Sequence, residues 1–97
     1  MKSVVSLASR ASVPDGIVFQ SLQDEMVLLN LHTGVYFGLN AVGARMWQLI
    51  QAHQNTPLNE VLDALVDEYD VPPDRCAGDL LTLVTRLEEN RLLEIDQ

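Results

Sequence analysis

The sequence predicts one α+β domain with a winged-helix-like architecture, in which an N-terminal three-stranded antiparallel sheet packs on three helices. Short aliphatic and aromatic segments separated by turn signals occupy residues 17–39, which is typical of strands. Apolar residues then recur with helical spacing in three segments between residues 40 and 90. Strands followed by helices, without alternation, indicate the α+β class. A chain of 97 residues has room for one compact domain.

The strands are expected in three short segments. The first, residues 17–20, follows the turn sequence PDG, because proline fixes φ and glycine accepts a positive φ. The other two, residues 26–31 and 35–39, form a hairpin in which Gly34 takes the positive φ that a tight turn requires. β-branched and aromatic side chains in the returning strand favour a pleated conformation. Together these segments predict the antiparallel sheet.

Three amphipathic helices are expected behind the sheet. The side-chain carbonyl of Asn40 caps the first helix, and Pro57 at the first helical position begins the second. The sequence DVPPD separates the second helix from the third. The apolar stripes are Val42, Met46, Trp47, Leu49 and Ile50 in the first helix, Leu58, Val61, Leu62, Leu65, Val66 and Tyr69 in the second, and Ala77, Leu80, Leu81, Val84 and Leu87 in the third. We expect Leu92, Leu93 and Ile95 to fold back onto the core that these stripes form.

Residues 1–13 are expected to form a flexible N-terminal tail ahead of the domain, which then spans residues 14–97. Several serines and Arg10 interrupt the apolar residues of this tail, so it lacks the core of a signal peptide. No internal repeats or low-complexity tracts divide the remaining chain.

The charge of the chain limits the partners that it can bind. Six basic residues stand against fourteen acidic residues, which gives a net charge of −8. Nucleic acids and anionic membranes are bound through basic surfaces, so both are disfavoured as partners. No segment approaches the roughly 18 consecutive apolar residues of a membrane span. The single cysteine, Cys76, excludes an intrachain disulfide and suits a reducing cytoplasm, where we expect the protein to be located.

No arrangement of residues in the sequence points to catalysis or to a metal site. His32 and His53 lie far apart, and neither belongs to a pair with metal-ligand spacing. The acidic cluster at residues 67–70 lacks the alternating ligands and the glycine turn of a calcium loop. No serine–histidine or cysteine–histidine pattern suggests a nucleophile. We therefore expect a protein that is not an enzyme and that uses no cofactor or metal.

A DNA-binding winged-helix regulator is an alternative, because the second helix, the break and the third helix resemble a helix-turn-helix. The third helix would then enter the major groove. It carries Asp79, Glu88 and Glu89 against Arg75 and Arg86, so the DNA phosphates would repel it. The charge balance therefore disfavours this alternative.

Residues 26–47, MVLLNLHTGVYFGLNAVGARMW, resemble the signature of the PqqD-like family, the peptide-recognition elements of pathways that modify ribosomally made peptides. The signature combines a hydrophobic strand, a threonine–glycine turn, an aromatic pair, a leucine–asparagine pair, a glycine and a helical aromatic residue. These are Leu28 and Leu29, Thr33 and Gly34, Tyr36 and Phe37, Leu39 and Asn40, Gly43, and Trp47. Residues 79–94 are similar to the third helix of the family, and the resemblance covers nearly everything from Asp15 onward.

The resemblance implies a fold of three strands on three helices and a non-catalytic function. Members of the family bind the leader segment of a precursor peptide by strand addition and present the peptide to a modifying enzyme or a leader peptidase. The chain resembles the free-standing members of lasso-peptide and pyrroloquinoline quinone (PQQ) pathways, and we expect a monomer or a weak dimer. The implied peptide site combines the edge of the third strand with the outer side of the third helix: Val35, Tyr36, Phe37, Gly38, Leu39, Cys76, Asp79, Leu80, Leu83, Arg86 and Leu87.

Residues 35–39 also have the character of a strand edge that accepts another strand. They contain neither charge nor proline, the features that usually block such an edge, and Gly38 permits close approach of another backbone. The added strand can come from a leader peptide or from a second copy of this chain. Tyr36 and Phe37 point to opposite faces of the strand, and the sequence leaves open which of them faces the peptide groove.

Four residues of the third helix allow two interpretations. Leu80 and Leu87 belong either to the core or to the wall of the peptide site. Val84 is expected in the core. Asp79 and Arg86 lie two helical turns apart on one face, so each can meet a polar group of a leader or serve only as a solvated surface charge.

Overall fold

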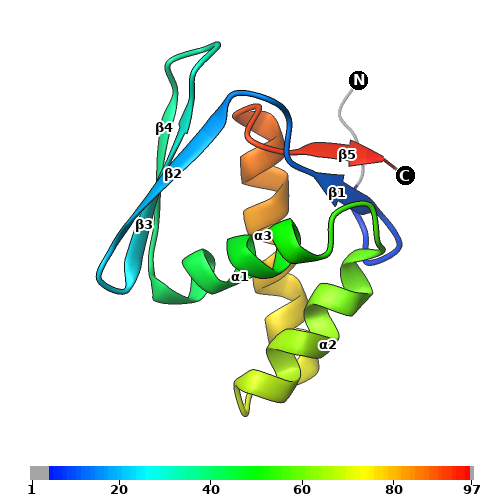
Figure 1. Ribbon diagram of the computed structural model, residues 1–97. Coiled ribbons are helices and arrows are strands. Elements are labelled where there is room, and N and C mark those ends of the chain that lie inside the picture. The colour runs from blue at the N-terminus through cyan, green and yellow to red at the C-terminus, as the bar shows by residue number, and fades with distance from the viewer. Residues whose placement is uncertain (1–4, 97) are drawn as a thin grey trace.

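The computed structural model describes residues 5–96, which form two antiparallel sheets and three helices (Figure 1). In chain order the elements are β1 (Arg10–Ser12), β2 (Ile17–Leu22), β3 (Glu25–Asn30), β4 (Tyr36–Leu39), α1 (Ala41–Ala52), α2 (Leu58–Glu68), α3 (Pro73–Glu89) and β5 (Glu94–Asp96). In the view of Figure 1 the β2–β3–β4 sheet stands to the left of the helices, and α3 runs behind α1. The predicted α+β, winged-helix-like architecture is confirmed.

The main sheet has the strand order β2–β3–β4, so β4 is an edge strand. β3 and β4 pair antiparallel in a register that places Met26 opposite Leu39 and Leu28 opposite Phe37. Gly34, in the loop between them, has a φ of +74°, as the turn requires. The predicted hairpin is confirmed, although β3 begins and ends one residue earlier than expected and β4 begins one residue later.

A second, two-stranded sheet joins the two ends of the domain. β1 pairs antiparallel with β5, and the Ser9 carbonyl accepts a hydrogen bond from the Leu58 N–H at the start of α2. The flexible tail expected over residues 1–13 is therefore not found at β1, while residues 1–4 lie outside the described residues. A three-residue strand shows no periodicity, and its partner lies at the other end of the chain, so local sequence patterns do not reveal it.

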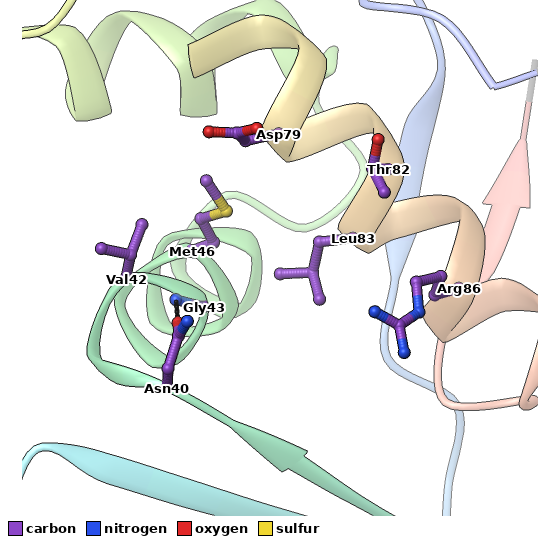
Figure 2. Close-up of a pocket in the computed structure, with 8 residues that line it drawn as sticks. All are labelled: Asn40, Val42, Gly43, Met46, Asp79, Thr82, Leu83 and Arg86. Carbon is purple, nitrogen blue, oxygen red and sulfur yellow. Dashed lines mark hydrogen bonds between the residues drawn. The ribbon is translucent and has the colours of Figure 1, made fainter. Parts of the chain in front are cut away.

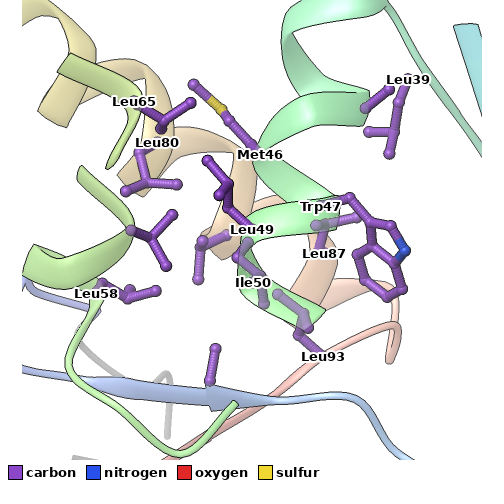
Figure 3. Close-up of a cluster of buried hydrophobic side chains, with 14 of the residues drawn as sticks. Leu39, Met46, Trp47, Leu49, Ile50, Leu58, Leu65, Leu80, Leu87 and Leu93 are labelled. Carbon is purple, nitrogen blue, oxygen red and sulfur yellow. The ribbon is translucent and has the colours of Figure 1, made fainter. Parts of the chain in front are cut away.

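The core lies among the three helices and extends to the main sheet through Met26, Leu28 and Leu39, and most of it comes from the predicted apolar stripes (Figure 3). Side chains with at most 1% of their surface exposed include Met26, Leu28, Trp47, Ile50, Leu58, Val61, Leu65, Leu80, Val84, Leu87 and Leu92. The expectation that Leu92 and Leu93 fold back onto the core is confirmed, since Leu93 is only 2% exposed. Val42 differs from its predicted core position, because 45% of its surface is exposed.

Of the two helix starts predicted from the sequence, one is confirmed and one is displaced by a residue. The Asn40 side-chain oxygen accepts a hydrogen bond from the Gly43 N–H at 2.9 Å, which confirms the cap of α1. Pro57 precedes α2 instead of occupying its first helical position.

Arg45 of α1 donates hydrogen bonds to the Glu68 carboxylate at the end of α2, and these bonds hold the pKa of the Glu68 carboxyl below its ordinary value. Because this ion pair is exposed, it adds little to stability.

Asn30, at the end of β3, connects the hairpin loop to the segment after α3. Its side-chain nitrogen donates to the Arg91 carbonyl at 2.8 Å, and its side-chain oxygen accepts from the N–H groups of His32 and Thr33 at 2.9 and 3.2 Å. The residue is only 4% exposed. Asn30 therefore fixes the position of β4 relative to the end of α3, a role that the sequence did not reveal.

Replacement of Asn30 by alanine is expected to lower the free energy of unfolding by about 2–3 kcal/mol, because three partly buried hydrogen bonds are lost. Urea denaturation followed by circular dichroism measures this change. Asn30→Asp keeps the acceptor for the loop but places a carboxylate oxygen against the Arg91 carbonyl at a buried site, so at neutral pH it should destabilise the protein at least as much as alanine does. A loss below about 0.5 kcal/mol for Asn30→Ala would show that these bonds do not hold the hairpin in place.

Candidate functional site

The outer edge of β4 is unpaired within residues 5–96. The Asn30 N–H donates to the carbonyl of Val35, directly opposite, at 3.0 Å. Because bonded and non-bonded pairs alternate along an antiparallel ladder, Tyr36 and Gly38 belong to the non-bonded pairs. Their N–H and C=O groups therefore point toward the open edge. A Cβ atom added to Gly38 would meet nothing within 4 Å, so the face of the sheet is open at this residue.

A groove runs between the N-terminal half of α1 and one face of α3, directly after the end of β4 (Figure 2). Its first hollow has a volume of 340 Å³. The lining residues are Asn40, Val42, Gly43 and Met46 on the α1 side and Asp79, Thr82, Leu83 and Arg86 on α3. Figure 2 shows the Leu83 side chain in the space between the helices, with Asp79 and Arg86 toward the two ends. The floor of the hollow is therefore apolar and its ends are charged.

A second hollow of 270 Å³ continues the groove toward the start of α3. It shares Val42, Met46 and Asp79 with the first hollow. The remaining lining residues come from α2, α3 and the connection between them: Leu65, Tyr69, Val71, Arg75 and Cys76. Most of these side chains are apolar, so the second hollow suits an apolar group. The two hollows form one groove that extends away from the open edge of β4.

Phe37 is the aromatic residue of β4 that faces α3. The guanidinium carbon of Arg86 lies 5.4 Å from the centroid of the Phe37 ring, within the range of a cation–π interaction. Tyr36 points to the opposite face of the sheet, beside its register partner Leu29, and is 71% exposed. Phe37 is therefore the residue of the pair on the side of α3, although neither side chain lines the two hollows of the groove.

The α3 residues predicted for the site divide into two groups. Four of them line the groove: Cys76, Asp79, Leu83 and Arg86. Leu80 and Leu87 are 0% exposed and lie in the core, so in this structure their side chains are not available to a ligand. They support the wall of the groove from behind. This placement differs from the site prediction and agrees with the core alternative.

The α1 side of the groove was not predicted from the sequence. Val42 and Met46 belong to a regular helical stripe, which normally indicates the core, and Gly43 carries no side chain that could signal a site. Leu39, which was predicted for the strand side of the peptide site, is only 4% exposed, so its side chain belongs to the core. The sequence offered one signal for the α1 side of the groove: the apolar stripe of α1 extends into its first turn, to Val42. In the structure Val42 is 45% exposed.

Cys76 supplies a chemical probe of the second hollow. Burial raises the pKa of the Cys76 thiol above its ordinary value, and the nearby Asp79 charge raises it further. A raised pKa lowers the thiolate fraction near neutral pH, and the thiolate is the form that reacts with alkylating agents. We expect iodoacetamide to modify Cys76 at least about tenfold more slowly in the folded protein than in urea, as followed by mass spectrometry. Equal rates would show that the thiol is neither buried nor shifted in solution.

The described residues were compared with the requirements of a metal site and of a membrane-spanning helix. No group of three or more His, Cys, Asp or Glu side chains in the described residues is arranged to hold a metal ion. Across the same residues, no helix has both the length and the apolar character needed to cross a bilayer.

Fold and site together define a small winged-helix-like domain whose open strand edge lies beside a groove between two helices. Residues 25–93 match the family model described as coenzyme PQQ synthesis protein D (PqqD), and the chain belongs to this family. The resemblance predicted from residues 26–47 is thereby confirmed. A search of curated protein sequences gives no match.

A solved structure with the same fold is that of TbiB1 in complex with the TbiA(beta) leader peptide. The two chains are 39% identical, with a TM-score of 0.76, and the match covers 84% of this chain and 93% of TbiB1. Neither comparison supports the DNA-binding alternative.

Proposed function

We propose that this protein binds the leader segment of a ribosomally made precursor peptide and catalyses no reaction itself. The leader adds as a strand to the outer edge of β4, and its side chains enter the groove between α1 and α3. The observation that carries this proposal is the unpaired edge at Tyr36 and Gly38, which opens beside an apolar groove. Membership of the PqqD family and the similarity to a protein solved with a leader peptide support it.

The energetics assign different roles to the edge and the groove. Main-chain hydrogen bonds at Tyr36 and Gly38 contribute about 0.5–1.5 kcal/mol each, whereas ordering the peptide costs about 1–2 kcal/mol per residue. These two contributions roughly cancel, so the edge mainly sets the orientation of the peptide. Micromolar affinity corresponds to about −8 kcal/mol, and buried apolar side chains at about 1.5–3 kcal/mol each must supply most of it. The two hollows provide the places for such side chains.

Titration of a fluorescent leader peptide tests the proposal. The probes are the N-terminal segments of short precursor peptides encoded beside the gene, with the TbiA(beta) leader as a further probe. We expect a dissociation constant in the micromolar range and slower alkylation of Cys76 when a peptide fills the second hollow. No binding of any of these peptides below about 1 mM would contradict the proposal.

We further propose that the bound leader is delivered to a peptide-modifying enzyme or a leader peptidase in the cytoplasm. Both lasso-peptide and PQQ pathways fit the resemblance, and the neighbouring genes distinguish them. A radical enzyme encoded nearby would indicate PQQ-type synthesis, whereas a leader protease and a cyclase would indicate lasso-peptide maturation.

The open edge also bears on the oligomeric state, for which we propose a monomer or a weak dimer. Pairing of β4 with a second copy would occupy the same backbone groups as the leader. Light scattering across a concentration series measures such a dimer, and addition of the leader should dissociate it. A dimer that persists with bound leader would place the contact elsewhere.

A further inference from the structure

We propose that Arg86 selects peptides with an acidic side chain at one fixed position, and that Asp79 disfavours an acidic side chain two or four residues away, on the same face of the peptide. This inference rests on the proposed function and names the residues that give the groove its specificity. It assigns the two charges of the first hollow to recognition, where the sequence alone also allowed solvated surface charges.

Arg86 is positioned to bind a carboxylate. Its guanidinium is held against the Phe37 ring, and Figure 2 shows it turned toward the groove. Within residues 5–96 it forms no ion pair, in contrast to Arg45, which is bonded to Glu68. A guanidinium that contacts an aromatic ring can still donate hydrogen bonds from its edges to a carboxylate. The partner of Arg86 is therefore expected to come from the bound peptide.

Asp79 carries the opposite charge at the other end of the first hollow. Its carboxylate lines both hollows and has no ion-pair partner in the part of the chain that the structure describes. Asp79 and Arg86 lie about 10.5 Å apart along the helix axis. An extended peptide advances about 3.3 Å per residue and its side chains alternate between two faces, so the groove-facing side chains nearest to this separation are two or four residues apart. The groove therefore distinguishes an acidic position from one where a basic or uncharged group is preferred.

The surroundings strengthen this discrimination. Leu83 and Met46 lie between the two charges, so a bound peptide excludes water there and each charge acts in a less polar environment. The net charge of −8 repels acidic peptides from most of the protein, which makes the exposed cations of the groove, Arg86 in the first hollow and Arg75 in the second, local exceptions. Charge complementarity of this kind fixes the register of a peptide more than it raises affinity.

Selection from a displayed library of random twelve-residue peptides tests the inference without knowledge of the natural leader. We expect the wild-type protein to enrich aspartate or glutamate at one position and to deplete them two or four residues away. With Arg86→Glu, the enriched position should change to lysine or arginine while the apolar positions stay the same. A selected acidic peptide should bind the Arg86→Glu protein about ten- to hundredfold more weakly than it binds the wild type. The same peptide with lysine at the acidic position should bind the Arg86→Glu protein more tightly than it binds the wild type.

Arg10→Glu is the matched control, because it makes the same change in net charge on β1. It should leave the enriched positions unchanged. The inference is overturned if wild-type binders show no fixed acidic position, if Arg86→Glu keeps the acidic preference, or if Arg10→Glu inverts it as well. In these outcomes peptides still bind, so the proposed function stands. Failure to select any peptide would overturn both.

Discussion

Replacement of Tyr36 by proline is expected to weaken leader binding strongly while the domain stays folded. The Tyr36 N–H points to the open edge, so its loss removes no hydrogen bond between β3 and β4. Proline is tolerated on edge strands for this reason. The peptide loses one main-chain bond, keeps an unpaired carbonyl and meets the proline ring, which together cost about 2–4 kcal/mol. Fluorescence titration should therefore show binding weakened at least about thirtyfold.

Two controls separate the backbone effect from other causes. Tyr36→Ala removes the same side chain and keeps the N–H, so it should bind the leader nearly as well as wild type. Phe37→Pro removes an N–H that points toward β3 and should lower the melting temperature clearly. If folded Tyr36→Pro protein binds as tightly as Tyr36→Ala, the leader does not add to β4 and the proposed geometry is wrong.

Local patterns in the sequence were sufficient to predict the main sheet, the helices and the edge strand. The hairpin was predictable because Gly34 and the alternating side chains act over a few residues. The β1–β5 sheet was not, because it depends on pairing between the two ends of the chain. The backbone groups that point outward were also beyond prediction, since they follow from the register and not from residue type.

The groove could be predicted only on one side. The family resemblance implied a site that groups Leu80, Leu83 and Leu87 together, although Leu80 and Leu87 are fully buried and Leu83 lines the first hollow. Which edge of an apolar stripe stays open depends on where the neighbouring helix lies, and periodicity carries no such information. For the same reason Val42 was assigned to the core, whereas it forms part of the opposite wall.

Replacement of Leu83 by aspartate is expected to weaken leader binding at least about hundredfold. Leu83 is half-buried at the centre of the first hollow, so the change removes an apolar contact worth about 1.5–3 kcal/mol. It also places a carboxylate where a bound peptide would exclude water, at a further cost of about 1–3 kcal/mol. Titration of the fluorescent leader measures the loss, and thermal melting shows whether the variant stays folded.

Leu81→Asp is the matched control for this prediction. Leu81 is also half-buried on α3, but it lines neither hollow and lies nearly on the opposite side of the helix from Leu83. Both variants lose a partly buried leucine and gain the same charge, so both should lower the melting temperature, and only Leu83→Asp should lose affinity. Equal affinities for the two folded variants would place the leader away from α3 and leave the edge of β4 as the whole site.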